Sequence, residues 1–347
     1  MATATIDAPA KINLTLEILG TRPDGYHELR SVVMPVSLHE TVTVSTRADD
    51  RITCETRGEG VDVSELEALP LERQLAAKAV RAMQRRLGRT GPGSGVDVRV
   101  AKRVPIGAGM GGGSADAAGV LACLRALWAP EMPEEELLAA GAECGSDVPA
   151  MLLGGAVLME GRGERVSRLL APGEHPTPMW LVAVFPGYHV STKAVYDLYD
   201  RSKVQRFEGS KVQEAEDSGV RTFELSNFRT CEQGTDGQRL TNGGSLCENC
   251  ARSVRNGDAR ACAQSLFNGL QETVSRLHPS TERFCLALGR AGALGALLTG
   301  SGSAVYGLAG SREEAEAIRR SMGGAVRCEV LQTLPDGVMA AHGPLVP

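Results

Sequence analysis

The chain has 347 residues, of which 42% are hydrophobic and 23% charged, and its formal net charge is −5. This length predicts two domains, and this composition is typical of a folded globular protein, so wholesale disorder is excluded. A general nucleic-acid-binding function is also excluded, because such proteins carry an excess of cations that replace counterions on the phosphate backbone.

The start of the chain contains neither a cluster of basic residues nor an apolar run, so no secretory signal is expected. The uncharged stretch 291–311 has the length of a membrane span, but glycines and serines interrupt it around a Thr-Gly-Ser-Gly-Ser sequence. It is predicted to form two strands joined by a loop. The nine cysteines are an odd number, which predicts reduced thiols. We therefore expect a cytoplasmic protein without a membrane partner.

The first half of the chain is predicted to contain both strands and helices. Apolar and polar side chains alternate in residues 11–19, which is typical of a strand with one buried face. Further strands are expected at 41–45, 51–56, 95–100 and 156–160, and helices at 73–87, from Ser114 to about 128, at 134–145 and briefly after Asp147.

After about residue 172 the pattern restarts with a strand at 180–185 and a helix at 191–201. Residues 203–244 are charged, rich in Ser and Gly and without periodicity, which predicts a long surface insertion. The remaining expected elements are helices near 246–256, 258–276 and 280–290, strands on both sides of the Thr-Gly-Ser-Gly-Ser loop, a helix at 312–321 with a capping box of Ser311 and Glu314, and a strand at about 325–332.

This succession of elements, with runs at the start that have the pattern of antiparallel strands, favours an α+β fold over a doubly wound parallel sheet. We expect an N-terminal domain at 1–171 and a C-terminal domain at 172–347. The polar insertion at 203–244 would lie within the second domain.

A run of glycines leads directly into one of the predicted helices, with Ser114 as its expected N-cap. Glycines let the backbone approach a ligand closely, and the N–H groups and dipole at a helix N-terminus favour phosphate. The chain has no Walker A motif, but Gly107, Gly109 and Gly112 match the dinucleotide-binding pattern G-x-G-x-x-G. The charged residues between strand and loop, and the strands upstream, argue against that alternative. The run is therefore predicted to bind a polyphosphate.

The sequence PIGAGMGGGSADAA resembles the ATP loop of the GHMP kinases, which act on galactose, homoserine, mevalonate and phosphomevalonate. Four blocks resemble more closely the family of 4-diphosphocytidyl-2-C-methyl-D-erythritol kinases, and they stand in that family's order: DAPAKINLTLEILGTRPDGYHELRSVV, KRVPIGAGMGGGSADAA, GSDVPAMLLGGAVLMEGRGE and LTGSGSAVYGLA. The PDGYHEL block is the most specific of these matches. The resemblance implies a two-domain GHMP kinase fold, with a glycine-rich ATP loop in an N-terminal domain of strands and helices and an α/β sandwich as C-terminal domain.

The same resemblance implies ATP-dependent phosphorylation of the 2-hydroxyl of a cytidine-diphosphate alcohol, 4-diphosphocytidyl-2-C-methyl-D-erythritol, in the non-mevalonate isoprenoid pathway. ATP and Mg²⁺ are the implied cofactors, and the alcohol is the implied small-molecule partner. Two alternatives remain open: a GHMP kinase for another alcohol such as homoserine or mevalonate, and a non-catalytic ligand-binding relative. The sequence indicates no oligomeric state.

Phosphoryl transfer to an alcohol needs positioning, charge neutralisation and a group that takes the hydroxyl proton. Asp147 is the best candidate base, although an Asp before a short helix is commonly only an N-cap. Lys11 lies on the polar side of the first predicted strand, where a lysine is usually solvated. The resemblance implies that both residues are catalytic, with Lys11 orienting Asp147 and offsetting charge on the transferring phosphoryl group.

The resemblance also assigns binding residues. Asn13, Tyr26, His27 and Asp147 match positions that hold the alcohol, where Tyr26 can stack on cytosine and His27 can hydrogen-bond its edge. The alternative for this segment is a tight turn at 23–25 with an aromatic residue packed behind it. The residues assigned to ATP are Lys102, Pro105, Ile106, Gly107, Ala108, Gly109, Met110, Gly111, Gly112, Gly113, Ser114 and Ala115. No side chain is assigned to a metal.

Two positions depart from the family's usual pattern. Gln74 replaces an Asn near the adenine site, and FNGLQ at 267–271 replaces FNDLE. The resemblance therefore specifies adenine contacts and the packing of the second domain less closely than it specifies the reacting groups.

The cysteines raise the possibility of a zinc site. Cys231, Cys247, Cys250 and Cys262 could supply four thiolates, but their spacing fits no common zinc ribbon. We expect ordinary helix cysteines at 247 and 250 instead.

Overall fold

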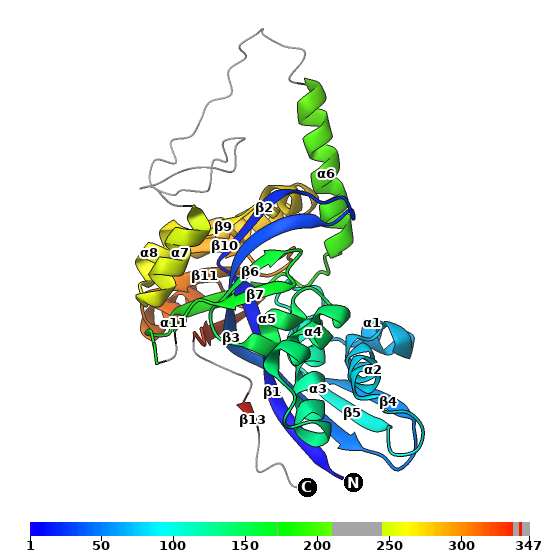
Figure 1. The fold of residues 1–347 in the computed structure, drawn as a ribbon. Coiled ribbons are helices and arrows are strands. Elements are labelled where there is room, and N and C mark those ends of the chain that lie inside the picture. Colours follow the sequence, from blue (N-terminus) through cyan, green and yellow to red (C-terminus); the bar gives the residue numbers. More distant parts are fainter. Residues whose placement is uncertain (172, 210–244, 336–339, 342–347) are drawn as a thin grey trace, which may run out of the picture.

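The computed structural model describes residues 1–171, 173–209, 245–335 and 340–341. Among these residues it contains a nine-stranded and a four-stranded sheet, with helices packed on both (Figure 1). The mixture of helices and largely antiparallel strands confirms the expected α+β fold.

The larger sheet is organised around one long strand, β3 (His27–Thr46). It pairs antiparallel with β1 (Thr3–Asn13), β2 (Thr15–Thr21), β5 (Val96–Lys102) and β6 (Val157–Gly161). The other strands of this sheet are β4 (Ile52–Gly58), β7 (Arg165–Arg168), β9 (Phe267–Asn268) and β13 (Ala340–Ala341). Because β9 and β13 come from the second half of the chain, both halves of the sequence build this sheet.

Four helices pack together beside this sheet: α2 (Leu75–Leu87), α3 (Gly112–Trp128), α4 (Glu134–Cys144) and α5 (Val148–Leu153). Their apolar sides share one buried cluster with alternate strand residues such as Ile6, Val44 and Val98. Gly119 lets α3 lie close to β3, because a Cβ there would come within 2.8 Å of the Val42 side chain. A short helix α1 (Ser64–Glu67) and a 3₁₀ turn η1 (Leu71–Arg73) precede α2.

The smaller sheet is fully antiparallel in the order β10 (Gly295–Leu298), β11 (Val305–Ala309), β8 (Trp180–Phe185) and β12 (Arg327–Gln332). Alternate residues of β8 face opposite ways, because side chains in a strand alternate. Val182 and Val184 pack with α9 (Gln271–Leu277), α10 (Ser280–Arg290) and α11 (Arg312–Ser321). Leu181 and Ala183 share a core with β1, α7 (Leu246–Arg255) and α8 (Ala259–Gln264). The smaller sheet therefore lies between two apolar layers.

The predicted strand at 11–19 differs from the structure in two ways. It is divided between β1 and β2, and its polar side is buried together with its apolar side. The buried polar residues are Lys11, Asn13, Thr15 and Glu17. Alternation in the sequence shows which side is apolar, but it does not show that distant segments cover the polar side.

Three further expectations need correction. The predicted helix at 258–276 is interrupted, because Phe267 and Asn268 form β9 and pair in parallel with β2. α6 (Thr192–Gly209) extends beyond the predicted helix end, so 203–209 of the predicted insertion is helical, and 210–244 lies outside the described residues. The hydroxyl of Ser311 caps α11 as expected, but the Glu314 carboxylate accepts from Gly310 N–H rather than from Ser311.

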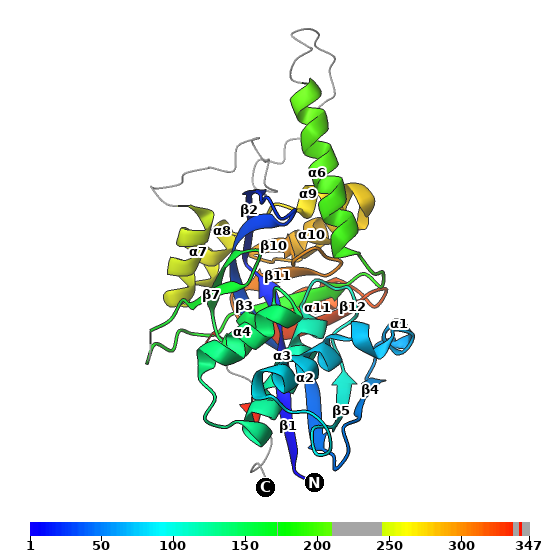
Figure 2. The same cartoon turned by 45° about the vertical axis from the view of Figure 1, so that its right-hand side comes forward.

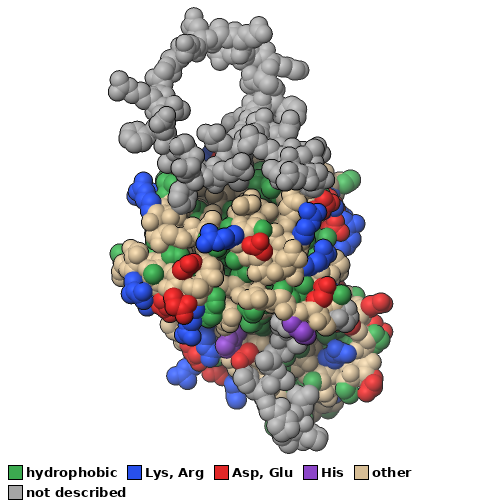
Figure 3. Space-filling model, turned by 90° about the vertical axis from the view of Figure 1, so that its left-hand side faces the viewer, with side chains coloured by type: hydrophobic (Ala, Val, Ile, Leu, Met, Phe, Trp, Pro, Cys, Tyr) green, Lys and Arg blue, Asp and Glu red, His purple; other side chains and the backbone are tan. Residues whose placement is uncertain are grey.

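The exterior of the molecule has one projecting helix and a face of mixed charge (Figures 2 and 3). α6 projects from the body of the molecule when the view is turned (Figure 2). On the face drawn in Figure 3, acidic and basic side chains are interspersed. In the parts of the chain that the structure describes, every helix is too short or too polar to span a membrane.

Candidate active site

The glycine loop joins β5 to α3. Gly107, Gly109 and Gly111 have φ angles of +66°, +74° and +71°, a region that side chains other than glycine rarely adopt. α3 begins at Gly112, and no side chain caps it. Ser114, the expected N-cap, lies within the first turn instead. The first N–H groups of α3 are therefore available to bind an anion.

A second loop, residues 299–303 between β10 and β11, supports the glycine loop. Ser303 N–H donates to the Gly107 carbonyl at 2.9 Å, and Ala304 N–H donates to the Ala108 carbonyl at 3.0 Å. The two backbones touch so closely that a Cβ on Gly109 would overlap the Thr299 carbonyl oxygen. Glycine at 109 is required by this contact as well as by its positive φ.

Lys11 connects the glycine loop to the predicted base. Its Nζ lies 3.6 Å from Asp147 Oδ2, and it donates to the Gly109 carbonyl at 2.9 Å and to Asn13 Oδ1 at 2.6 Å. Lys11 is buried, whereas the Asp147 side chain is 34% exposed. The ammonium group is therefore fixed between the loop and a carboxylate that a ligand can reach.

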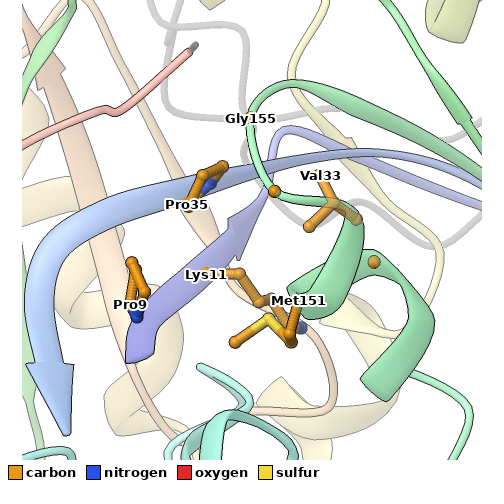
Figure 4. A pocket seen from close by; sticks show the side chains of 8 residues that line it. Pro9, Lys11, Val33, Pro35, Met151 and Gly155 are labelled. Carbon is orange, nitrogen blue, oxygen red and sulfur yellow. The ribbon is translucent and has the colours of Figure 1, made fainter. Parts of the chain in front are cut away.

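The aliphatic part of Lys11 lies against an apolar wall. Figure 4 shows it among Pro9, Pro35, Val33 and Met151, which line a cavity of about 10 Å³. A space of this size is about the minimum that holds one water molecule. The stem of Lys11 is therefore closely packed by these apolar side chains.

Asp147 occupies the N-cap position of α5, but its side chain makes no capping hydrogen bond. Pro149 is the second residue of this helix, so one of the N–H groups that a capping carboxylate would bind is missing. The alternative that Asp147 serves only as a helix cap is therefore wrong. Its carboxylate is oriented toward Lys11 instead.

Lys102 lies beside the glycine loop, but its side chain is buried and its ammonium is engaged by two carboxylates. It is 1% exposed, and its Nζ donates to Glu40 Oε1 at 2.8 Å and to Asp116 Oδ2 at 2.7 Å. Burial raises the pKa of both carboxyl groups, although the ammonium opposes this. The ammonium of Lys102 is enclosed by these two carboxylates, so a contact with ATP would need an exchange of partners, and its assignment to ATP stays a prediction.

The buried cluster of Lys102, Glu40 and Asp116 nevertheless touches the glycine loop. A Cβ on Gly112 would lie 3.0 Å from Glu40 Oε1 and 3.2 Å from Lys102 Nζ. The Glu40 carboxylate also accepts from Arg103 N–H at 2.6 Å, just before the loop. This buried cluster therefore packs against the start of α3 and fixes the segment that leads into the loop.

Other residues assigned to ATP offer only their backbone. The side chains of Ala108, Met110 and Ala115 are buried in the two main cores. Pro105, Ile106 and Gly113 are partly exposed along the same segment. A ligand on this loop would therefore meet main-chain groups rather than side chains at most positions.

The segment at 23–27 forms the tight turn that was one of the two expectations. Asp24 Oδ1 accepts from Tyr26 N–H at 3.1 Å, and Gly25 has a φ of +82°. The ring of Tyr26 is not packed behind the turn, since the residue is 52% exposed, with the Arg162 guanidinium 5.2 Å from its centroid. An exposed ring is available for stacking on a flat ligand.

His27 is the buried residue of this segment. Its ring stacks on Tyr196 of α6 with centroids 4.8 Å apart, and its Nε2 lies 2.8 Å from Asp200 Oδ1. Burial, together with the charge of Asp147, raises the pKa of the Tyr196 phenol. Tyr196 is therefore part of the site, although no pattern in the sequence had indicated it.

Asn13 forms hydrogen bonds through both its side-chain amide and its backbone. Its amide accepts from Lys11 and donates to Ser31 Oγ at 2.8 Å. Its backbone N–H donates to Thr299 Oγ1 at 3.1 Å, and its carbonyl accepts from the Tyr306 hydroxyl at 2.9 Å. Thr299 of the 299–303 loop and Tyr306 of β11 thus fix the strand end that carries Lys11.

The two departures from the family pattern have structural roles. Gln74 donates to the Leu69 carbonyl at 3.1 Å and so ties the segment before it to the start of α2. In FNGLQ the changed residue Gln271 accepts from Leu298 N–H, and Asn268, which the family pattern shares, donates to the Leu298 and Gly300 carbonyls, both at 2.8 Å. These side chains shape the loop at 299–303.

Cys247, Cys250 and Cys262 lie in the core rather than at the site. Cys250 Sγ and Cys262 Sγ are 3.7 Å apart, and Cys247 Sγ is 2.9 Å from the Thr15 hydroxyl. Within the described residues, no group of three or more His, Cys, Asp or Glu side chains is arranged to hold a metal ion. Cys231 lies outside the described residues.

Two family models match the chain: the GHMP kinases N-terminal domain at residues 74–155 and the GHMP kinases C-terminal domain at 245–327. A protein of Streptomyces avermitilis named 4-diphosphocytidyl-2-C-methyl-D-erythritol kinase is 36% identical over 95% of this chain and 96% of its own length. A protein of the same name from Symbiobacterium thermophilum is 35% identical over 89% of this chain and 91% of its own length.

Solved structures agree with these matches. The crystal structure of a 4-(cytidine 5′-diphospho)-2C-methyl-D-erythritol kinase is similar with a TM-score of 0.65 and 28% identity, over 95% of this chain and 98% of the other. A homoserine kinase from Cytophaga hutchinsonii has a TM-score of 0.68 at 16% identity, over 99% of this chain and 98% of the other. The latter likeness shows the fold alone.

Proposed function

We infer the function of this chain from the finding that it belongs to the GHMP kinases, and within them to the family of 4-diphosphocytidyl-2-C-methyl-D-erythritol kinases. It is a small-molecule kinase that transfers a phosphoryl group from ATP to 4-diphosphocytidyl-2-C-methyl-D-erythritol, in the non-mevalonate route to isoprenoid precursors. The acceptor that we propose is the 2-hydroxyl. The alternatives, another GHMP alcohol kinase and a non-catalytic relative, lack comparable support.

The observation that best supports catalysis is the position of Lys11. Its ammonium contacts both the glycine loop and Asp147, so one cation lies between the predicted phosphate site and the predicted base. Phosphoryl transfer relies mainly on positioning and charge stabilisation. We propose that Lys11 stabilises the transferring phosphoryl group and that Asp147 orients the hydroxyl and accepts its proton.

We propose that ATP binds with its phosphates on the N–H groups of the glycine loop and of the start of α3. The helix dipole and the main-chain donors both favour an anion there. The division into residues 1–171 and 172–347 stays part of the proposal, with the nucleotide held by the first part and its loop supported by residues 299–303 of the second.

Mg²⁺ is proposed as the metal that accompanies ATP. Mg²⁺ is usually held by one or two carboxylates together with substrate phosphates, rather than by a protein cage. The donor set fits this pattern, because Asp147 supplies a partly exposed carboxylate beside the loop. When bound, the ion would neutralise charge on the phosphates, and Asp147 would help to hold it through one carboxylate oxygen while the other accepts the hydroxyl proton.

At the acceptor end we propose that Tyr26 stacks on the cytosine ring. The exposed ring and the Arg162 guanidinium beside it support this role. His27 and Asn13 are already engaged by Asp200, Lys11 and Ser31. We therefore propose that these two shape the pocket wall and that contacts from them to the alcohol need an exchange of partners.

We also propose a reducing, cytoplasmic setting and no nucleic-acid partner. The eight cysteines in the described parts of the chain are all free, which supports a reducing compartment. The net charge of −5 supports the second point.

The function is tested by measuring ADP release with a panel of alcohols. We expect turnover with 4-diphosphocytidyl-2-C-methyl-D-erythritol and no comparable turnover with homoserine or mevalonate. Preference for either of those alcohols would contradict the proposed substrate, and ADP release with none of them would favour the non-catalytic alternative.

Replacing Gly109 with Ala is expected to weaken ATP binding at least about tenfold. The new Cβ would overlap the Thr299 carbonyl and would require a positive φ, so the loop must move. Titration calorimetry with ATP and with the alcohol measures the two affinities separately. The control is Gly88→Ala, which shares a positive φ of +60° but has no atom within 4 Å of the new Cβ. Equal losses for both ligands in Gly109→Ala would indicate general misfolding instead.

A further inference from the structure

The absence of a side chain at Gly107, the first glycine of the loop, leaves space that the ring of His189 occupies. Gly107 has a φ of +66°, and a Cβ on it would overlap the imidazole ring of His189. His189 belongs to the segment between β8 and α6, in the second half of the chain. The ring therefore packs directly on the backbone at the start of the proposed phosphate site.

The other side of this imidazole faces an acid from the first half of the chain. Glu65 Oε2 of α1 lies 3.3 Å from His189 Nδ1, and the two side chains are 62% and 46% exposed. Gln74 ties the segment after α1 to the start of α2, and the Leu75 side chain lies 3.3 Å from where a Cβ of Gly113 would be. The loop is thus bordered by His189 at its start and by the start of α2 at its end.

We propose that His189 contacts the phosphates of the bound nucleotide, and that the Glu65 carboxylate competes with those phosphates for it. His189 and Glu65 would form an exchangeable clasp beside Gly107. This inference rests on the proposed function, because it assumes that ATP occupies the glycine loop.

The charges and exposures of the pair make such an exchange possible. An exposed pair of this kind contributes little to stability, so it opens easily. A triphosphate on the loop carries several negative charges, which would attract a ring N–H of His189 and would repel the Glu65 carboxylate. Neither residue has to move a buried group, since both side chains are partly solvated.

The test measures dissociation constants by titration calorimetry for ADP, a non-hydrolysable ATP analogue and adenosine. The variants are Glu65→Gln, His189→Ala, their combination, and Glu67→Gln. Glu67 is the matched control because it removes the same charge from the same short helix. We expect Glu65→Gln to tighten binding of the ATP analogue about two- to fivefold and His189→Ala to weaken it by a similar factor.

Two further results are required. Adenosine, which has no phosphate, should bind all variants equally, and Glu65→Gln should tighten binding of the ATP analogue less once His189 is replaced. Equal effects of Glu65→Gln and Glu67→Gln would overturn the clasp, because the gain would then come from net charge alone. An unchanged affinity in His189→Ala would overturn it as well.

These failures differ from a failure of the proposed function. If the unmodified protein bound none of the three nucleotide probes, the assignment of the loop to ATP would be wrong. If every variant bound the nucleotides with the affinity of the unmodified protein, the kinase assignment would stand and His189 would be only a packing residue.

Discussion

Replacing Asp147 with Asn is expected to lower kcat by about 10²–10⁴-fold, the range for a positioned acid–base group. Asn keeps the size of the side chain but cannot take the hydroxyl proton. Stability should change by no more than about 1 kcal/mol, because the exchange weakens one partly exposed ion pair and removes no capping bond. Steady-state ADP release and thermal unfolding measure the two quantities.

The matched control is Asp258→Asn. Asp258 caps α8 by accepting from Ala261 N–H at 2.9 Å, so it has the helix-capping role that Asp147 lacks. Its replacement should leave kcat unchanged. Near-normal turnover of Asp147→Asn would remove this residue from the reaction, and the proposed base would have to be sought elsewhere.

Replacing Lys102 with Met is expected to destabilise the protein by about 3–5 kcal/mol, the usual effect of removing one partner of a buried ion pair. The change would leave Glu40 and Asp116 buried together without the ammonium that both contact. One oxygen of Asp116 already has no hydrogen-bond partner among the described residues. Urea unfolding followed by circular dichroism gives the free energy.

Two controls separate charge from packing in this experiment. Lys78→Met, on the exposed side of α2, should change stability by less than about 0.5 kcal/mol. The triple variant Lys102→Met, Glu40→Gln, Asp116→Asn should recover part of the loss, because it removes the uncompensated carboxylates. A loss below about 1 kcal/mol for Lys102→Met alone would mean that the cluster does not support the loop.

Much of the fold could be predicted because its signals are local. The glycine run, the alternation of Val96, Val98 and Val100, and the capping hydroxyl of Ser311 each act on residues nearby in sequence. Most predicted helices and strands are present for this reason. The resemblance of four sequence blocks identified the family, and the comparisons confirm it.

The errors share one cause, which is that the deciding contacts are distant in sequence. β9 replaces part of a predicted helix because Phe267 pairs with Thr15, about 250 residues earlier. Local propensity is a weak prior, and tertiary pairing overrides it.

The sequence by itself determined which residues are chemically able to bind phosphate and to move a proton. The tertiary structure alone decided their partners. Two lysines with similar sequence surroundings differ in this way: Lys11 reaches Gly109 and Asp147, whereas Lys102 is enclosed by Glu40 and Asp116. Periodicity reports which side of a strand is apolar, but a charged side chain is defined by the groups that replace its water, and distant segments supply those groups.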